Sequence, residues 1–168
     1  PTRLYNAGSG ECFGESPEGG AGEEDAFRPR SPYAAAKAAA FWQVANYREA
    51  YGLFACSGIL FNHESPLRPE RFVTRKVVRA AARIKNGSEE KLKLGNLDVS
   101  RDWGAAEEYV VAMHAMLTRD KADDFVIATG QVNSLEKFVE TAFELAGLDW
   151  NDHVEVDKTL FRPTDIRR

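Results

Sequence analysis

The order of apolar and polar positions along the chain predicts alternating strands and helices. A near-continuous apolar run, Leu53–Phe61, is typical of a strand buried on both faces of a parallel sheet. Just before it, Ser31 and Pro32 mark the start of an alanine-rich helix that ends at Gly52. Arg3–Ala7 is partly apolar and predicts an earlier strand. Helix, glycine turn and buried strand form half of a βαβ unit, so the fold class is α/β.

The rest of the chain continues this alternation. We expect further helices over 72–85, 102–117 and 134–146, and short strands over 92–94, 124–128 and 154–156. Two stretches rich in glycine, proline and charge, 14–30 and 62–71, are predicted to be loops. In the first of them, the acidic run Glu23-Glu24-Asp25 is interpreted as a solvated face.

Composition narrows the class of protein. With 43% hydrophobic and 29% charged residues, the chain is ordinary for a globular protein. A net charge of −4 argues against nucleic acid or an anionic membrane as the main partner, since both require a cationic surface. No apolar run is long enough for a membrane-spanning helix. Two cysteines cannot form a disulfide framework and indicate a reducing compartment. The three histidines show no metal-ligand spacing, so no metal is expected.

Two pairs of residues are candidates for chemistry. Tyr33 and Lys37 are four residues apart and so share one helix face, where the ammonium would stabilise a phenolate. Ser9 and Glu11 follow the first predicted strand, and open α/β sheets place ligand sites at such strand ends. Spacing alone also fits a surface tyrosine and lysine, and a serine and glutamate that merely begin a loop.

The combination resembles a known family. Ser9-Gly10-Glu11-Cys12-Phe13-Gly14 and Arg30-Ser31-Pro32-Tyr33-Ala34-Ala35-Ala36-Lys37 resemble the extended short-chain dehydrogenase/reductases that act on nucleotide sugars. Two further motifs, ILFNHESP at 59–66 and FVTRK at 72–76, are more specific and resemble the GDP-mannose 4,6-dehydratase family. The likeness extends over essentially the whole chain. Ser9 stands where family members usually carry threonine, which keeps the hydroxyl.

The resemblance implies a fold, a reaction and roles for particular residues. The fold would be the second half of a Rossmann-like NADP-binding domain over 1–61, followed by a smaller mixed α/β, GDP-sugar-binding region over 62–168 with some elements returning to the sheet. The enzyme would be a lyase that acts on GDP-mannose with NADP, as a homo-oligomer in the cytoplasm. The implied catalytic residues are Ser9, Glu11, Tyr33 and Lys37; the cofactor-binding residues are Tyr33, Lys37, His63 and Arg68; and the substrate-binding residues are Asn62, Val73, Lys76, Gly95, Arg101, Arg162 and Asp165.

One expected feature of that family is missing. The glycine-rich fingerprint that cradles the cofactor pyrophosphate does not occur in these 168 residues. We therefore expect a truncated dehydratase chain that is inactive alone. The alternatives are a non-catalytic remnant that binds a sugar nucleotide or serves as an assembly partner, and a sister nucleotide-sugar epimerase or reductase. Glu11 beside the hydroxyl of Ser9 argues against the sister enzymes.

Overall fold

The computed structural model describes residues 2–17 and 19–161, and these divide into two compact units. The first unit contains 2–63 and 102–131, and the second contains 64–101 and 132–161. The chain passes between the units within strands β3 (Asn62–Glu64) and β5 (Ser100–Ala105), and just before strand β7 (Val132–Ser134). Each unit is described below by itself.

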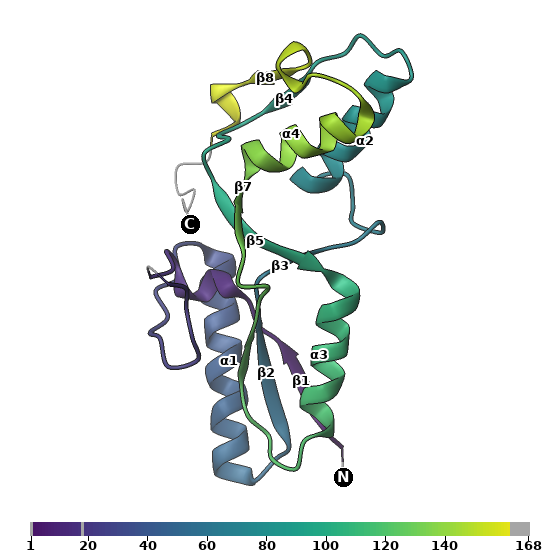
Figure 1. The fold of residues 1–168 in the computed structure, drawn as a ribbon. Helices are drawn as coiled ribbons and strands as arrows, with labels where there is room; N and C mark the ends of the chain where they lie inside the picture. Colours follow the sequence, from purple (N-terminus) through teal and green to yellow (C-terminus); the bar gives the residue numbers. More distant parts are fainter. Residues whose placement is uncertain (1, 18, 162–168) are drawn as a thin grey trace. The chain divides into compact units, whose positions relative to one another are not determined.

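The first unit is a three-layer α/β/α arrangement. Its sheet has the order β1–β2–β6, formed by β1 (Leu4–Ala7), β2 (Ala55–Leu60) and β6 (Phe125–Ile127), and all the pairings are parallel. Helix α1 (Pro32–Tyr51) packs on one face of the sheet and α3 (Ala106–Thr118) on the other (Figure 1). A short 3₁₀ helix, η1 (Gly10–Phe13), follows β1. The α/β class and the parallel sheet are confirmed.

Local signals set the boundaries of α1. The Ser31 hydroxyl accepts a hydrogen bond from the Ala34 N–H at 3.1 Å, and Pro32 occupies the first helical position. Gly52 ends the helix in the left-handed conformation with φ 64°. Every residue of β2 is buried, as the apolar run predicts, and Ile59 forms the centre of a cluster with Phe13 and Phe41.

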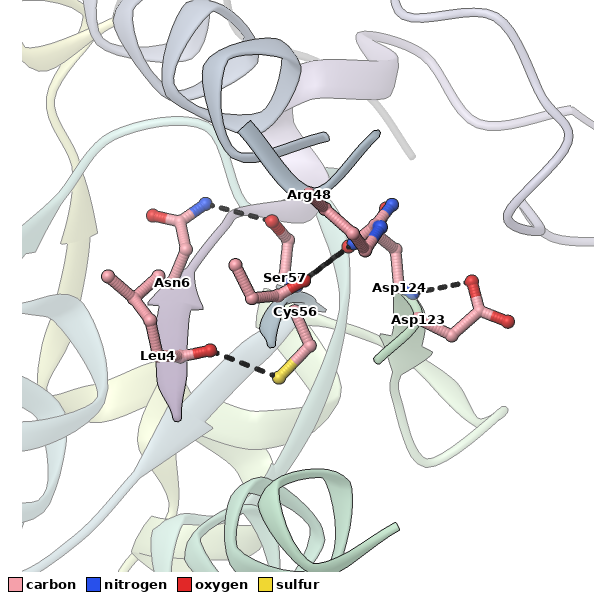
Figure 2. A network of polar contacts seen from close by, with 8 residues as sticks. Leu4, Asn6, Arg48, Cys56, Ser57, Asp123 and Asp124 are labelled. Carbon is pink, nitrogen blue, oxygen red and sulfur yellow. Dashed lines mark hydrogen bonds and ion pairs between the residues drawn. The ribbon is translucent and has the colours of Figure 1, made fainter. Parts of the chain in front are cut away.

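An ion pair fixes the far end of α1 to the sheet (Figure 2). The Arg48 guanidinium donates to both carboxylate oxygens of Asp124, at 2.9 and 2.6 Å, and to the carbonyl of Ala55 at 2.8 Å. Asp124 also accepts from the Ser57 N–H at 2.7 Å. The hydrogen bond with Asp124 raises the pKa of Arg48. One carboxylate therefore joins α1, β2 and the segment that leads into β6.

The second unit contains two helices and a two-stranded parallel sheet. Helix α2 (Val73–Lys85) packs against α4 (Leu135–Ala146). Strand β4 (Leu92–Leu94) pairs with β8 (Val154–Val156), with Lys93 opposite Glu155. Two 3₁₀ helices, η2 (Trp150–Asp152) and η3 (Lys158–Leu160), flank β8. The predicted helix 72–85 and the predicted strands 92–94 and 154–156 are confirmed.

Two of the predicted boundaries are wrong. Residues 102–105 belong to β5 and not to the predicted helix 102–117, because the Asp102 carboxylate accepts backbone hydrogen bonds from Thr129 and Gly130 instead of capping a helix. The predicted loop 62–71 begins with β3. The predicted cap of the last helix is confirmed, because Ser134 caps α4, and the short strand β7 comes just before it. These strands are only three residues long, too short for an alternating pattern to reveal. In the described part of the chain, none of the helices is long and apolar enough to span a bilayer.

Removing the charge of Asp124 should destabilise the first unit. Asp124→Asn leaves Arg48 largely buried without its counter-ion, and we expect the free energy of unfolding to fall by about 2–3 kcal/mol, at the low end for a broken buried pair because both side chains keep some exposure. Urea unfolding followed by circular dichroism measures this. Asp123→Asn is the matched control: Asp123 is exposed, its carboxylate accepts from the adjacent Asp124 N–H, and its charge contributes less than Asp124 to the raised pKa of Arg48. Equal effects of the two substitutions would contradict the structural role of the pair.

Candidate catalytic site

Ser9 and Glu11 lie where β1 ends and η1 begins. Ser9 is 8% exposed and is the N-cap of η1, with its Oγ accepting from the Glu11 N–H at 3.3 Å. Because the hydroxyl only accepts in this bond, its proton remains available to donate to a ligand. Glu11 is exposed. The sequence motif therefore forms a small capped turn that holds a hydroxyl and presents a carboxylate to solvent.

Tyr33 and Lys37 share one face of the first turns of α1. The Lys37 ammonium lies 5.8 Å from the centre of the Tyr33 ring and donates to the carbonyl of Ala7 at 2.8 Å. Ala7 is the last residue of β1, two positions before Ser9. Tyr33 is 52% exposed, so its phenol is accessible. The lysine thus joins the start of α1 to the end of the strand that leads to Ser9.

A second contact connects the same two elements. Cys12, in η1 next to Glu11, is 1% exposed, and its Sγ lies 3.7 Å from the carbonyl oxygen of Ala34, next to Tyr33. Burial raises the pKa of the Cys12 thiol, so it is a packing group and not a reactive thiolate. The structure therefore brings η1 and the first turn of α1 into contact, through the immediate neighbours of Glu11 and Tyr33.

His63 lies in a separate part of the first unit. Its ring stacks on Tyr109 with a centroid distance of 4.9 Å, and its Nδ1 is 2.9 Å from the carbonyl oxygen of Phe61. Asn62, the preceding residue, is half-buried in β3. Tyr109 is 3% exposed, and its hydroxyl has no hydrogen-bond partner among the described residues. Burial, with a smaller contribution from Asp102, raises the pKa of Tyr109 to about 12.

The second unit brings together some of the residues expected to bind substrate. The Lys76 ammonium, on the first turn of α2, donates to the carbonyl of Lys93 at 2.6 Å. Gly95 lies just after β4, and a Cβ there would stand 3.0 Å from the carbonyl oxygen of Leu160. Val73 begins α2. Helix α2, the end of β4 and η3 therefore meet around Lys76 and Gly95.

Two of the three arginines expected to bind ligands, Arg68 and Arg101, have partners in the structure. Arg68 lies 3.2 Å from the Glu64 carboxylate and stacks over the Phe72 ring at 3.7 Å. Arg101 donates to the carbonyl of Ser100 at 2.7 Å. The remaining predicted substrate residues, Arg162 and Asp165, lie outside the described residues. Within the described ranges, no group of three metal-ligating side chains comes together.

Three polar contacts escaped the sequence-based reasoning. Glu23 is exposed, as the interpretation of the acidic run as a solvated face predicts, but its carboxylate also accepts from the Val126 N–H at 2.8 Å. Asp102 is a buried carboxylate that holds Thr129 and Gly130, and Arg48 pairs with Asp124. In the sequence, Glu23 lies 103 residues from Val126, Asp102 lies 27 residues from Thr129, and Arg48 lies 76 residues from Asp124. No local pattern could have indicated them.

The chain is similar to proteins of known family and known structure. The family profile described as GDP-mannose 4,6 dehydratase matches residues 1–168. GDP-mannose 4,6 dehydratase 1 of Arabidopsis thaliana is 56% identical over 98% of this chain and 45% of its own length. The structure of RMD from Pseudomonas aeruginosa complexed with NADPH is similar with a TM-score of 0.84 and 26% identity, over 91% of this chain and 53% of that one.

Enzymes that catalyse other reactions share this fold. The UDP-glucose 4-epimerase of Thermus thermophilus in complex with NAD has a TM-score of 0.82 and 27% identity, over 99% of this chain and 54% of that one. Proteins with this architecture thus include NAD- and NADPH-bound enzymes of nucleotide-sugar metabolism. The chain spans about half the length of the curated relatives that it matches.

The buried phenol of Tyr109 should make stability depend on alkaline pH. Its pKa of about 12 lies above the usual 10.0, so the folded state holds the proton more tightly than the unfolded state. Its contribution is complete below pH 10 and is lost as the pH rises towards 12. We expect Tyr109→Phe to reduce the loss of stability over this range, without lowering stability at pH 7.

Urea unfolding between pH 7 and 12 measures this dependence. Tyr5, whose pKa burial also raises to about 12, keeps its own contribution in the variant. Tyr47→Phe is the matched control because Tyr47 is 54% exposed. An unchanged alkaline slope in Tyr109→Phe would show that the phenol titrates alike in the folded and unfolded chain.

Proposed function

The chain belongs to the GDP-mannose 4,6-dehydratase family, and from this we propose that it carries the catalytic residues of an enzyme that converts GDP-mannose to GDP-4-keto-6-deoxymannose. The observation that best supports the proposal is the pair of contacts between η1 and α1. Lys37 bonds the carbonyl of Ala7, and Cys12 contacts the carbonyl of Ala34. Together they hold Tyr33 and Lys37 on the element next to Ser9 and Glu11.

Each of these groups suits one role in the proton transfers of this reaction. Tyr33, as a phenolate beside the Lys37 ammonium, would remove the proton from the C4 hydroxyl of mannose, while the Ser9 hydroxyl donates a hydrogen bond to the same oxygen. A ketone at C4 acidifies the neighbouring C5–H. Glu11 would remove that proton and deliver one to the C6 hydroxyl as it leaves as water. One exposed carboxylate can perform both steps because it is a base before the first and an acid before the second.

The residues present fit a nicotinamide cofactor at this position. The Lys37 ammonium has three N–H donors and uses one on Ala7, so two remain for ribose hydroxyls. We propose that Tyr33, Lys37, His63 and Arg68 contact NADP. When bound, NADP would supply the acceptor for the C4 hydrogen and its return to C6, with a proton from solvent completing C5. Tyr33 and Lys37 would therefore serve both the cofactor and the substrate.

For the substrate, we propose that the GDP-sugar is held by Asn62, Val73, Lys76, Gly95, Arg101, Arg162 and Asp165. A planar guanidinium pairs with two oxygens of a pyrophosphate, which suits Arg101 and Arg162. At Gly95 the absence of a side chain lets η3 approach the end of β4, since a Cβ there would stand 3.0 Å from the carbonyl oxygen of Leu160. The contact between Lys76 and the end of β4 supports grouping Lys76 with Gly95.

We also propose that the enzyme is a homo-oligomer of the cytoplasm. Helix α1 leaves Trp42, Tyr47 and Tyr51 exposed on its outer surface, with exposed fractions of 62, 54 and 69%. Large exposed aromatic side chains on one helix favour a protein partner. Cys12 and Cys56 are free thiols, which fits a reducing compartment.

The sharpest test removes the proposed base without changing its shape. Glu11→Gln cannot accept the C5 proton but can still hydrogen-bond, so we expect formation of the 4-keto-6-deoxy product to fall by roughly 10²–10⁴-fold with unchanged affinity for GDP-mannose. Tyr33→Phe should abolish product because the C4 hydroxyl keeps its proton. The measurements are product formation and exchange of the C5 hydrogen with deuterated solvent.

The assay uses the full polypeptide that contains these residues, because the 168 residues contain no glycine-rich dinucleotide fingerprint. Glu15→Gln is the matched control, being an exposed carboxylate four positions further along. Full-rate water loss by Glu11→Gln would reduce Glu11 to a loop carboxylate and would overturn the proposal. Epimerised GDP-sugar in place of the 4-keto product would favour the sister epimerases.

A further inference from the structure

We propose that Glu23 is a positioning residue for this reaction, because its carboxylate anchors the loop that joins the two proposed catalytic elements. The inference rests on the function proposed above. The loop, residues 14–30, starts directly after η1, which carries Glu11, and ends at Ser31, the cap of α1, which carries Tyr33. Whatever fixes the loop therefore constrains both proton-transferring side chains.

The anchor is a single side-chain contact on the outer edge of the sheet. β6 is an edge strand, and Ile127 accepts from Phe61 on its inner side, so the Val126 N–H between neighbouring ladder bonds points away from β2. The Glu23 carboxylate accepts from that N–H at 2.8 Å. A backbone donor that would otherwise face solvent on an exposed sheet edge is thereby capped by the loop.

Hydrogen bonds within the loop close the turn that contains Glu23. Gly22 and Asp25 exchange two hydrogen bonds: the Gly22 N–H donates to the Asp25 carboxylate at 2.8 Å, and the Asp25 N–H donates to the Gly22 carbonyl at 3.1 Å. Glu23 stands inside this closed turn. Ala21 and Val126 both pack against the cluster of Phe13, Phe41 and Ile59, so apolar contacts surround the polar one.

The second half of the loop contacts both elements that carry the proposed catalytic residues, η1 and α1. Phe27 lies edge-on to Phe13 of η1 at 5.2 Å and to Phe41 of α1 at 4.9 Å between ring centres. The Arg28 N–H donates to the carbonyl of Cys12 at 2.8 Å, one residue from Glu11. Two hydrogen bonds thus hold the loop, one from the Val126 N–H to Glu23 and one from the Arg28 N–H to the carbonyl of Cys12. The Phe27 ring packs against Phe13 and Phe41.

A positioning role predicts an effect on turnover and not on binding. Glu23→Ala frees the loop from β6, so we expect kcat for the 4-keto product to fall roughly 10- to 100-fold with little change in KM, within what a displacement of up to 1 Å costs. Glu23→Gln should restore most of the activity, because its amide oxygen can still accept from Val126. Glu24→Ala is the matched control: within the described ranges, Glu24 makes no hydrogen bond or ion pair.

Hydrogen–deuterium exchange gives an independent readout of the anchor. In the full polypeptide that contains the chain, the Val126 amide should exchange faster in Glu23→Ala than in the parent or in Glu24→Ala, while the buried strand β2 keeps its protection. Asp25→Ala, which opens the turn but keeps the Glu23 carboxylate, should give an intermediate result. This variant provides a second route to the same loss of anchoring.

The outcomes separate the two proposals. If the parent forms no 4-keto product, the proposed function fails and the positioning role fails with it, whatever the exchange of Val126 shows. If the parent is active but Glu23→Ala keeps its kcat and its Val126 protection, the inference about Glu23 is overturned and the proposed function stands. Equal losses of kcat in Glu23→Ala and Glu23→Gln would also overturn it, since the hydrogen bond would then not matter.

Discussion

The bidentate pair between Arg48 and Asp124 fixes the orientation of the helix on which the rest of the site depends. It ties the last turn of α1 to β2 and to the segment leading into β6, at the amino ends of those strands. The helix is 20 residues long, about 30 Å, so its first turn lies far from this point. There the Lys37 ammonium bonds the carbonyl of Ala7 at the carboxyl end of β1. A helix held at both ends against the same parallel sheet cannot slide or tilt without breaking a charged contact.

This restraint explains how exposed side chains can form a defined site. Tyr33 and Glu11 are open to solvent, yet each has an immediate neighbour, Ala34 or Cys12, in the contact between α1 and η1. The 3₁₀ turn is in turn capped by Ser9. Position is thus determined by backbone-directed contacts, while the reacting groups remain free to meet a ligand. The carboxyl end of β1, where these elements converge, is the edge at which open α/β sheets bind their ligands.

The elements whose ends are set by local interactions could be predicted from the sequence. Ser31, Pro32 and Gly52 are local signals, and α1 begins and ends where they indicate. The buried strand β2 followed from its unbroken apolar run. The start of α3 could not be predicted in the same way, because Asp102 looks like a helix cap but bonds a turn 27 residues away. For the candidate site, the family resemblance supplied the roles, whereas the links through Ala7, Asp124 and Val126 depend on chain segments that only folding brings together.

Glu23 shows that neighbouring acidic residues of the same charge can make different contacts in the folded chain. Glu23, Glu24 and Asp25 carry the same charge, yet Asp25 closes a turn, Glu23 caps a sheet edge and Glu24 remains exposed. The difference comes from backbone donors that a linear pattern does not show. Since the cap on Val126 and the bond from Arg28 to Cys12 act on one loop, an acidic side chain that contacts neither Tyr33 nor Glu11 directly helps to determine where both lie. Two of the proposed reacting groups also belong to this scaffold, since Ser9 caps η1 and the Lys37 ammonium bonds the carbonyl of Ala7, whereas Glu11 and Tyr33 are left exposed.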